Sequence, residues 1–410
     1  MSYRFANNLT VEEYDRFASS HPLYNIYQSS AWAVVKKEWN HRFVGIYDQN
    51  QLVLASLVLY RKLPLKYTLF YLPKGPLADF SDHALLDFFV KELRSFAKTC
   101  KAIQVKISPN IMLSSIPYKE VKKHPAIRQS PVIEEFKRLG FQHHGFTLDM
   151  YETAQPRYCA TYYYPDNWPA DYNNKATKNV AKALKKGVML EVLDLHQLDI
   201  FADIMSYTEK RKNISLRNKE YYQRILQAYG QDAYMVVTKV DLARQLKLDR
   251  QNLQAFQQQL DQGVEAESKI KKLQDQIASL TREIAFINER LVTDGEVVYV
   301  SCLLAVKVGK TTEMLYAGMN ENYRKFYATY LSYLEGIKWG HEQGCTRCDF
   351  GGVQGTLDDG LTEFKSFFDP HIEEYIGEFD LVINRPINYL FLKAVPVYKK
   401  VRRFLRGKKA

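Results

Sequence analysis

A heptad repeat in the middle of the chain constrains its fold more than any other feature. Residues 241–292 contain no proline and a single glycine, Gly263, and are rich in glutamine and charge. Apolar residues recur at steps of three and four: Ile270, Leu273, Ile277, Leu280, Ile284, Ile287 and Leu291. A less strict repeat precedes Gly263, with Asp249 at one of its apolar positions. The pattern predicts an antiparallel helical hairpin that forms a two-stranded coiled coil.

Strand-like sequence flanks this hairpin on both sides. Residues 233–240 and 297–306 are rich in valine and other apolar residues, as expected of buried strands. An insertion at the tip of a β-hairpin leaves the parent domain intact. We therefore predict a first domain at 1–150, a discontinuous second domain at 151–240 and 293–383, a coiled-coil arm at 241–292 and a basic tail at 384–410.

The two predicted domains share one order of elements. In each, helices precede an antiparallel meander, and a further strand, a long helix and a last strand follow. The long helices are expected at 84–97 and 328–343, and the strands that follow them at 102–107 and 347–350. This order predicts an α/β (α+β) fold with two tandem domains of one type.

Several protein classes are excluded by the sequence. No apolar run approaches the ~20 residues that span a bilayer, and residues 1–17 lack the apolar core of a secretory signal. The five cysteines are odd in number and scattered, which favours free thiols in the cytoplasm. Cys345 and Cys348 have no matching second pair of ligands, so no metal site is predicted.

The net charge of +11 is concentrated in two short segments. The tail from residue 398 onward carries seven cations and no acid, and residues 175–186 carry five lysines and no acid. The tail fits either a segment that binds an anionic membrane or a solubilising terminus. The lysines predict a helix, ended by Gly187, with one basic face. That face is either solvated or a strip for phosphates: Lys175, Lys178, Lys182 and Lys185.

Three further motifs suggest contacts to an anionic substrate. Lys36 lies one turn from Trp39, so an amine could hold a phosphate while a ring covers a sugar. Arg217 lies just before a predicted helix, where it can bind phosphate or pair with Glu220. Lys365 lies among phenylalanines, and a partly desolvated lysine suits oxyanion stabilisation.

Several segments of the chain form a recognisable set: QSSAWAVVK, LPKGPL, YTEKRKNISLRNKEYY, the helical hairpin, DFGGVQG, LTEFKSFF and EYIGEFDLVINRPINYLF. In combination and in order, these segments resemble the Fem family of peptidoglycan interpeptide-bridge aminoacyltransferases, and the MurM/MurN branch in particular. The resemblance implies two tandem GNAT-like (acetyltransferase-like) domains. It also implies transfer of an amino acid, alanine or serine, from aminoacyl-tRNA to the stem-peptide lysine of a lipid-linked or UDP-linked muropeptide.

The resemblance also implies roles for individual residues. Phe364 and Lys365 match the pair at the aminoacyl-tRNA end, with the lysine as oxyanion stabiliser. Many relatives carry Asp where this chain has Ser108, so no carboxylate role is carried over there. Contacts to the precursor are expected from five residues: Lys36, Trp39, Arg217, Arg211 and Glu378.

The implied reaction requires no metal or redox cofactor, because aminoacyl-tRNA is the co-substrate. The implied location is the cytoplasm, peripherally attached to the inner face of the membrane. Two alternatives remain open from the residues alone: a GNAT-type N-acyltransferase that uses acyl-CoA, and a non-catalytic RNA-binding protein in which the arm and the basic strip are the function.

Overall fold

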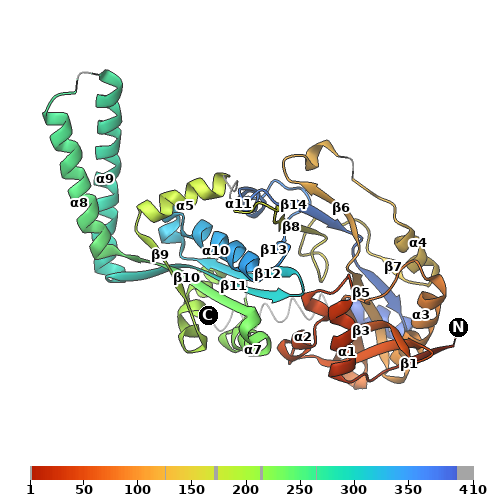
Figure 1. Cartoon of the computed structure of the whole chain (residues 1–410). Helices are drawn as coiled ribbons and strands as arrows, with labels where there is room; N and C mark the ends of the chain where they lie inside the picture. Colours follow the sequence, from red (N-terminus) through yellow and green to blue (C-terminus); the bar gives the residue numbers. More distant parts are fainter. Residues whose placement is uncertain (1, 125, 170–173, 213–215, 265, 395–410) are drawn as a thin grey trace.

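Two β-sheets with their helices make up the body of the molecule, and a long helical arm projects from one of them (Figure 1). The computed structural model describes residues 2–124, 126–169, 174–212, 216–264 and 266–394. Among these residues, no helix combines the length and apolar character needed to cross a membrane.

The first sheet has seven strands in the order β1-β2-β3-β4-β5-β15-β7. Its strands are β1 (Tyr3–Ala6), β2 (Asn40–Asp48), β3 (Gln51–Lys62), β4 (Thr68–Lys74), β5 (Ala102–Pro109), β15 (Phe379–Val382) and β7 (Gln142–His143). The accompanying helices are α1 (Val11–Ser20), α2 (Ser30–Val35), α3 (His83–Thr99) and α4 (Pro131–Arg138).

The second sheet has eight strands in the order β6-β14-β8-β13-β12-β11-β10-β9. Its strands are β6 (Met112–Pro117), β14 (His371–Tyr375), β8 (Tyr158–Tyr163), β13 (Arg347–Gly352), β12 (Thr311–Met319), β11 (Val297–Val308), β10 (Ala233–Asp241) and β9 (Val188–Val192). The accompanying helices are α5 (Lys175–Lys185), α6 (Leu198–Lys212), α7 (Lys219–Tyr229), α10 (Ala328–Glu342) and α11 (Gly360–Ser366).

Each sheet contains one parallel strand pair joined by a long helix. In the first sheet, β4 and β5 run parallel and α3 connects them. In the second sheet, β12 and β13 run parallel and α10 connects them. The common order predicted for the two halves is therefore present as a repeated strand-helix-strand unit.

Two strands cross the boundaries expected between the domains. Strand β6 lies within residues 1–150 but pairs with β14 in the second sheet, where Ile116 is opposite Ile372. Strand β15 lies within residues 293–383 but pairs with β5 in the first sheet, where Phe379 is opposite Ile107. Apolar periodicity identifies a strand but not its partner, so this exchange could not be predicted from the sequence.

The two domains also share a hydrophobic core. One cluster of buried side chains joins Val35 and Leu57 of the first domain to Phe201, Tyr222 and Leu304 of the second. A large apolar interface of this kind opposes independent movement of two domains. Residues on either side of the interface are therefore held in a fixed relative position.

The arm is the predicted helical hairpin. Helices α8 (Leu242–Asp261) and α9 (Glu267–Asp294) pack side by side and continue directly from β10 and into β11 (Figure 1). Leu246, Leu273 and Ile287 are buried in the seam between the helices or at its base. At its buried position, Asp249 accepts a hydrogen bond from Gln245 on one oxygen at 2.8 Å, and its other oxygen has no partner among the described residues.

Candidate active site

Lys36 and Arg217, which were predicted to act together, meet where the two domains join. Lys36 directly follows α2 in the first domain, and Arg217 precedes α7 in the second. Lys36 Nζ donates a hydrogen bond to the Tyr221 hydroxyl at 3.1 Å and lies 4.5 Å from the ring centre of Trp32. The guanidinium carbon of Arg217 lies 4.9 Å from the ring centre of Tyr221. Two cations from different domains flank one tyrosine, which suits the binding of a diphosphate.

The local sequence explains the position of Lys36. The Ser29 hydroxyl caps α2 by accepting a hydrogen bond from the N–H of Trp32 at 3.1 Å. Ala33 and Val35 bury the inner face of this short helix. Burial, with the Arg217 charge as the next cause, lowers the pKa of Lys36 to about 8.

Trp32 and Tyr221 are functional candidates that sequence reasoning missed. Trp32 precedes Lys36 by four residues and Tyr221 follows Arg217 by four, a spacing that brings side chains together on a helix. Trp39, which was predicted to accompany Lys36, lies in the turn after α2. Its ring centre is 6.4 Å from that of Tyr71, so it faces another part of the interface.

An aromatic cavity of about 500 Å³ lies in the second domain, away from Lys36. The end of β12, the start of α10 and α11 contribute most of its lining. Phe364 is central to it, with its ring centre 4.9 Å from that of Tyr330 and 4.9 Å from that of Tyr333. This cavity offers apolar walls with hydroxyl groups at their edges, as expected where a ring-bearing substrate end is held.

Arg211 is placed differently from the prediction. It lines the aromatic cavity and forms an ion pair with Glu321 at 3.2 Å. The structure does not bring it together with Lys36 and Arg217. Arg211 lies near the end of α6, whereas Arg217 lies just before α7.

Two lysines of the predicted basic strip stand at the rim of the aromatic cavity. All four lie on the exposed side of α5, as predicted. Lys175 Nζ lies 3.7 Å from the ring centre of Phe367, and Lys182 Nζ lies 5.1 Å from that of Tyr327. Both rings line the cavity, so a polyanion on α5 could extend one end into it.

Lys365 reaches the end of β13 from α11, the helix that also carries Phe364 of the cavity. It follows Phe364 on α11, and only 4% of it is exposed. Its Nζ donates hydrogen bonds to the carbonyls of Gly351 at 3.1 Å and Gly352 at 2.8 Å. Gly351 has a φ of +79°, which an L-residue rarely adopts, so the glycine-rich turn presents these carbonyls to the ammonium. Lys365 is thus a buried cation held at a fixed position at the end of β13.

Glu378 and Ser108 occupy the first domain. Glu378 forms an ion pair with Lys106, and its other oxygen accepts a hydrogen bond from the N–H of Ala154 at 2.9 Å. Both oxygens are engaged, which indicates a structural role at the start of β15. Ser108 Oγ accepts a hydrogen bond from the N–H of Lys74 at 3.2 Å.

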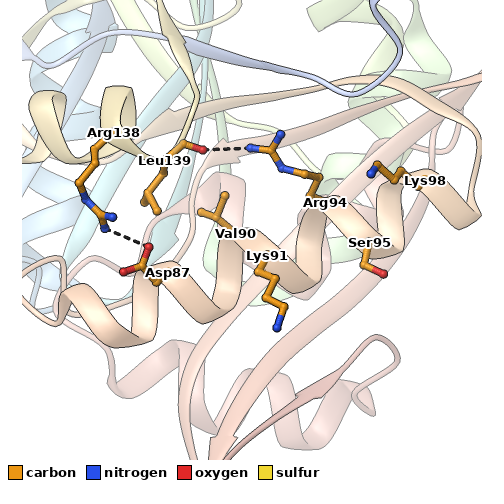
Figure 2. A pocket seen from close by; sticks show the side chains of 8 residues that line it. All are labelled: Asp87, Val90, Lys91, Arg94, Ser95, Lys98, Arg138 and Leu139. Atoms are coloured by element: carbon orange, nitrogen blue, oxygen red, sulfur yellow. Dashed lines mark hydrogen bonds and ion pairs between the residues drawn. The ribbon is translucent and has the colours of Figure 1, made fainter.

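A separate cavity of about 460 Å³ lies on the outer face of the first domain, between α3 and α4 (Figure 2). Its arginines are held by protein groups: Arg138 pairs with Asp87 at 3.0 Å, and Arg94 donates to the Leu139 carbonyl at 3.0 Å. None of the residues predicted from the sequence lines it. We therefore place the candidate active site at the interface between the domains and in the aromatic cavity.

Solved structures of other proteins have a fold similar to that of this chain. The structure called FemX has a TM-score of 0.72 and 26% identity, covering 95% of this chain and 99% of that chain. A tandem GNAT protein from the clavulanic acid biosynthesis pathway has a TM-score of 0.50 and 8% identity, covering 93% and 99%. The second likeness concerns the fold alone. The predicted arrangement of two tandem GNAT-like domains with an inserted hairpin is confirmed.

Sequence relatives extend over nearly the whole chain. A lipid II:glycine glycyltransferase of Staphylococcus epidermidis is 29% identical over 428 residues, which covers 98% of this chain and 99% of that protein. A protein of the same name from Staphylococcus aureus is 28% identical over 423 residues, with 96% and 97% covered. The model of the FemAB family matches residues 9–396. The chain belongs to the FemAB family.

Proposed function

We propose that this protein transfers an aminoacyl group from aminoacyl-tRNA to the stem-peptide lysine of a lipid-linked peptidoglycan precursor, and so builds an interpeptide bridge. The observation that carries the proposal is the meeting of Lys36 and Arg217 across Tyr221 at the junction of the domains. The proposal is also supported by the Staphylococcus relatives, whose names specify lipid II as the acceptor.

The two parts of the site divide the reaction between them. Lys36 and Arg217 hold the diphosphate of the acceptor. The aromatic cavity receives the aminoacylated end of the tRNA, and the lysines of α5 contact its phosphates. Lys365 stabilises the oxyanion that forms when the lysine amine of the acceptor attacks the ester carbonyl. The C–O bond of the ester then breaks, and the ribose hydroxyl leaves with a proton.

The direct test is mass spectrometry of the acceptor after incubation with the full-length protein and charged tRNA. Glycyl-, alanyl- and seryl-tRNA compete in one reaction, each with its own isotope label. The resemblance implies alanine or serine as the transferred amino acid, whereas the names of the relatives specify glycine. We expect a mass increase of one amino acid on a lysine-containing lipid-linked muropeptide. No increase with any of the three donors, together with release of a thiol from acyl-CoA, would point to the alternative acyl-CoA reaction.

If the basic face of α5 contacts tRNA, the affinity for tRNA should depend on salt concentration through these lysines. Replacing Lys175, Lys178, Lys182 and Lys185 with glutamate is expected to reduce the slope of log affinity for tRNA against log salt by roughly 3. Each lost phosphate contact accounts for about 0.7–0.9. Fluorescence titrations at several salt concentrations measure this slope.

The control for this experiment removes exposed lysines elsewhere. Lys91 and Lys98 lie on the outer face of α3 (Figure 2), and their replacement with glutamate is expected to leave the slope close to that of the wild type. Equal slopes for the α5 variant and the wild type would show that α5 is an ordinary solvated helix.

The basic tail predicts peripheral membrane attachment. The cations from Lys399 onward lie outside the described residues, but the helical residues just before them expose apolar side chains: Tyr389 at 59%, Leu390 at 61% and Leu392 at 54%. Deleting residues 399–410 should greatly reduce pelleting with anionic vesicles, because each cation near such a surface contributes ~1 kcal/mol. Transfer to a water-soluble precursor should be unchanged. Equal pelleting of the two forms would disprove the attachment.

A further inference from the structure

One face of the second sheet carries a row of polar side chains that the proposed function has not used. The strand register places Glu313 of β12 beside Asp349 of β13, Asp349 beside Thr161 of β8, and Thr161 beside His371 of β14. Side chains alternate along a strand, and the immediate neighbours of these residues belong to the apolar core beneath α10: Met314, Cys348, Ala160 and Ile372. The polar row therefore occupies the opposite face.

This face looks toward the first domain. Lys74, at the end of β4, reaches across so that its Nζ lies 3.3 Å from the ring centre of Tyr375. Burial raises the pKa of Tyr27, which belongs to the first domain, and the charges of Glu313 and Asp349 raise it further. Tyr27 in turn packs edge-on against Trp32, with ring centres 5.0 Å apart. Tyr27 therefore contacts the Trp32 ring that borders Lys36, and lies within electrostatic reach of the polar row.

The carboxylates on this face differ in how well they are satisfied. Glu373 is buried and fully engaged: it accepts hydrogen bonds from Tyr163 at 2.5 Å and Tyr375 at 2.7 Å, and Arg347 lies 3.5 Å away. Among the residues that the structure describes, Asp349 accepts one hydrogen bond, from the N–H of Gly351 at 2.6 Å.

Glu313 has even fewer partners. Within the described part of the chain, its carboxylate makes no hydrogen bond or ion pair, and like Asp349 it is only partly buried. Adjacent strands are about 4.8 Å apart, so the carboxylate of Glu313, which has no partner among the described residues, and that of Asp349, which has one, lie next to each other. Burial raises the pKa of both carboxyl groups. The charge of Asp349 raises the pKa of Glu313 further, and the charge of Glu373 raises that of Asp349 further.

A second observation shows that the row lacks a partner. Thr161 is fully buried between Asp349 and His371, and its hydroxyl has no hydrogen-bond partner among the described residues. A buried hydroxyl without a partner costs free energy, so such groups are normally satisfied by protein, water or ligand. A bound group that carries several N–H donors would satisfy the carboxylates and this hydroxyl together.

The row also lies beside the proposed oxyanion stabiliser. Asp349 accepts a hydrogen bond from the N–H of Gly351, and Lys365 donates a hydrogen bond to the carbonyl of the same glycine at 3.1 Å. One turn thus holds a carboxylate and a buried cation side by side. A group bound by the carboxylate would stand next to a carbonyl polarised by the lysine.

We propose that Asp349 and Glu313 bind the side-chain ammonium of the acceptor lysine and accept its proton before attack. This inference rests on the proposed function, because it assigns residues to the same reaction. The ammonium gives one proton to a carboxylate and becomes a neutral amine. The amine forms the new C–N bond, its second proton goes to the leaving ribose oxygen as the ester C–O bond breaks, and the carboxyl group releases its proton to water.

The raised pKa values of the two carboxyl groups assist this transfer. A free lysine amine has a pKa of about 10.4 and an ordinary carboxyl group one of about 4, so proton transfer from the ammonium to the carboxylate is steeply uphill. Raising the carboxyl pKa narrows this gap. The other charged groups that face the pair are Lys74, Arg347 and Glu373, and the buried Cys159 thiol lies with them.

The test measures binding of the acceptor without any donor, so that no turnover contributes. Calorimetry compares a short-chain lipid-linked muropeptide that contains lysine with the same compound containing norleucine, in which a hydrogen atom replaces the ammonium group. The wild type is expected to favour lysine by roughly 10- to 100-fold, the value of a charge-assisted contact. Asp349→Asn and Glu313→Gln should each lose most of this preference, and kcat with lysine acceptor should fall as well.

Controls separate this role from a structural one. Glu342→Gln removes an exposed carboxylate on α10 and should keep the full preference. If the pair only balances Lys74 and Arg347, the variants will unfold at lower temperature yet retain the preference for lysine, which would overturn the inference.

Two further outcomes have different meanings. A donor whose α-ammonium is replaced by a hydroxyl tests the other amine in the reaction. If the variants lose discrimination against that donor instead, the carboxylates hold the donor amine and the inference is wrong. If the wild type transfers to no lysine-containing precursor, the proposed function itself fails.

Discussion

Lys365→Met is expected to lower kcat by about 10²–10³ while leaving the acceptor KM nearly unchanged. The oxyanion exists only after the carbonyl is attacked, so a cation that stabilises it acts on the transition state and not on the bound substrates. The low exposure of Lys365, at 4%, strengthens this effect because little water screens the charge. Steady-state kinetics at saturating aminoacyl-tRNA measure the two constants separately.

Two controls accompany this variant. Lys338→Met removes an exposed cation from α10 of the same domain and should behave as the wild type. Because Lys365 also binds the carbonyls of Gly351 and Gly352, the thermal unfolding of Lys365→Met must be compared with that of the wild type. A folded variant with normal kcat and weaker tRNA binding would identify Lys365 as a phosphate contact.

The elements of the fold could be predicted from the sequence because they depend on local patterns. The heptad repeat gives α8 and α9, and Gly187 ends α5 with a φ of +71°. The exchange of β6 and β15 between the sheets depends on which strands meet in space. Local sequence carries no direct record of such pairing, so the domain boundaries expected at 150 and 383 do not follow the strands.

The same distinction applies to the site. Lys36 and Arg217 were found because each lies in a recognisable motif, and the structure brings them together across Tyr221. Arg211 lies six residues before Arg217 in the sequence but turns into the aromatic cavity. The pairing of Glu313 with Asp349 was invisible because 35 residues, including all of α10, separate the two strand positions. Only the parallel register of β12 and β13 makes them neighbours.

Lys36→Met and Arg217→Met are each expected to raise the acceptor KM by about 10- to 150-fold with little change in kcat. A charge-assisted hydrogen bond to a phosphate is worth ~1.5–3 kcal/mol, and the diphosphate is charged equally in the ground and transition states. Lys37→Met, which removes the exposed neighbouring cation, should leave KM within about twofold of the wild type. A loss of kcat at unchanged KM would contradict a binding role.

The lowered pKa of Lys36 adds a pH test that separates it from other cations. Its pKa of about 8 means that the free enzyme carries this charge at neutral pH and loses it as the pH rises to 9. The value of kcat/KM for the acceptor reports the ionisation of the free enzyme and substrate. Dividing the wild-type value by that of Lys36→Arg, whose guanidinium stays charged, removes the contribution of the acceptor amine. This ratio should fall between pH 7 and pH 9, because only the wild type loses its cation. A ratio independent of pH would show that Lys36 remains protonated throughout, and would contradict the lowered pKa that burial gives it.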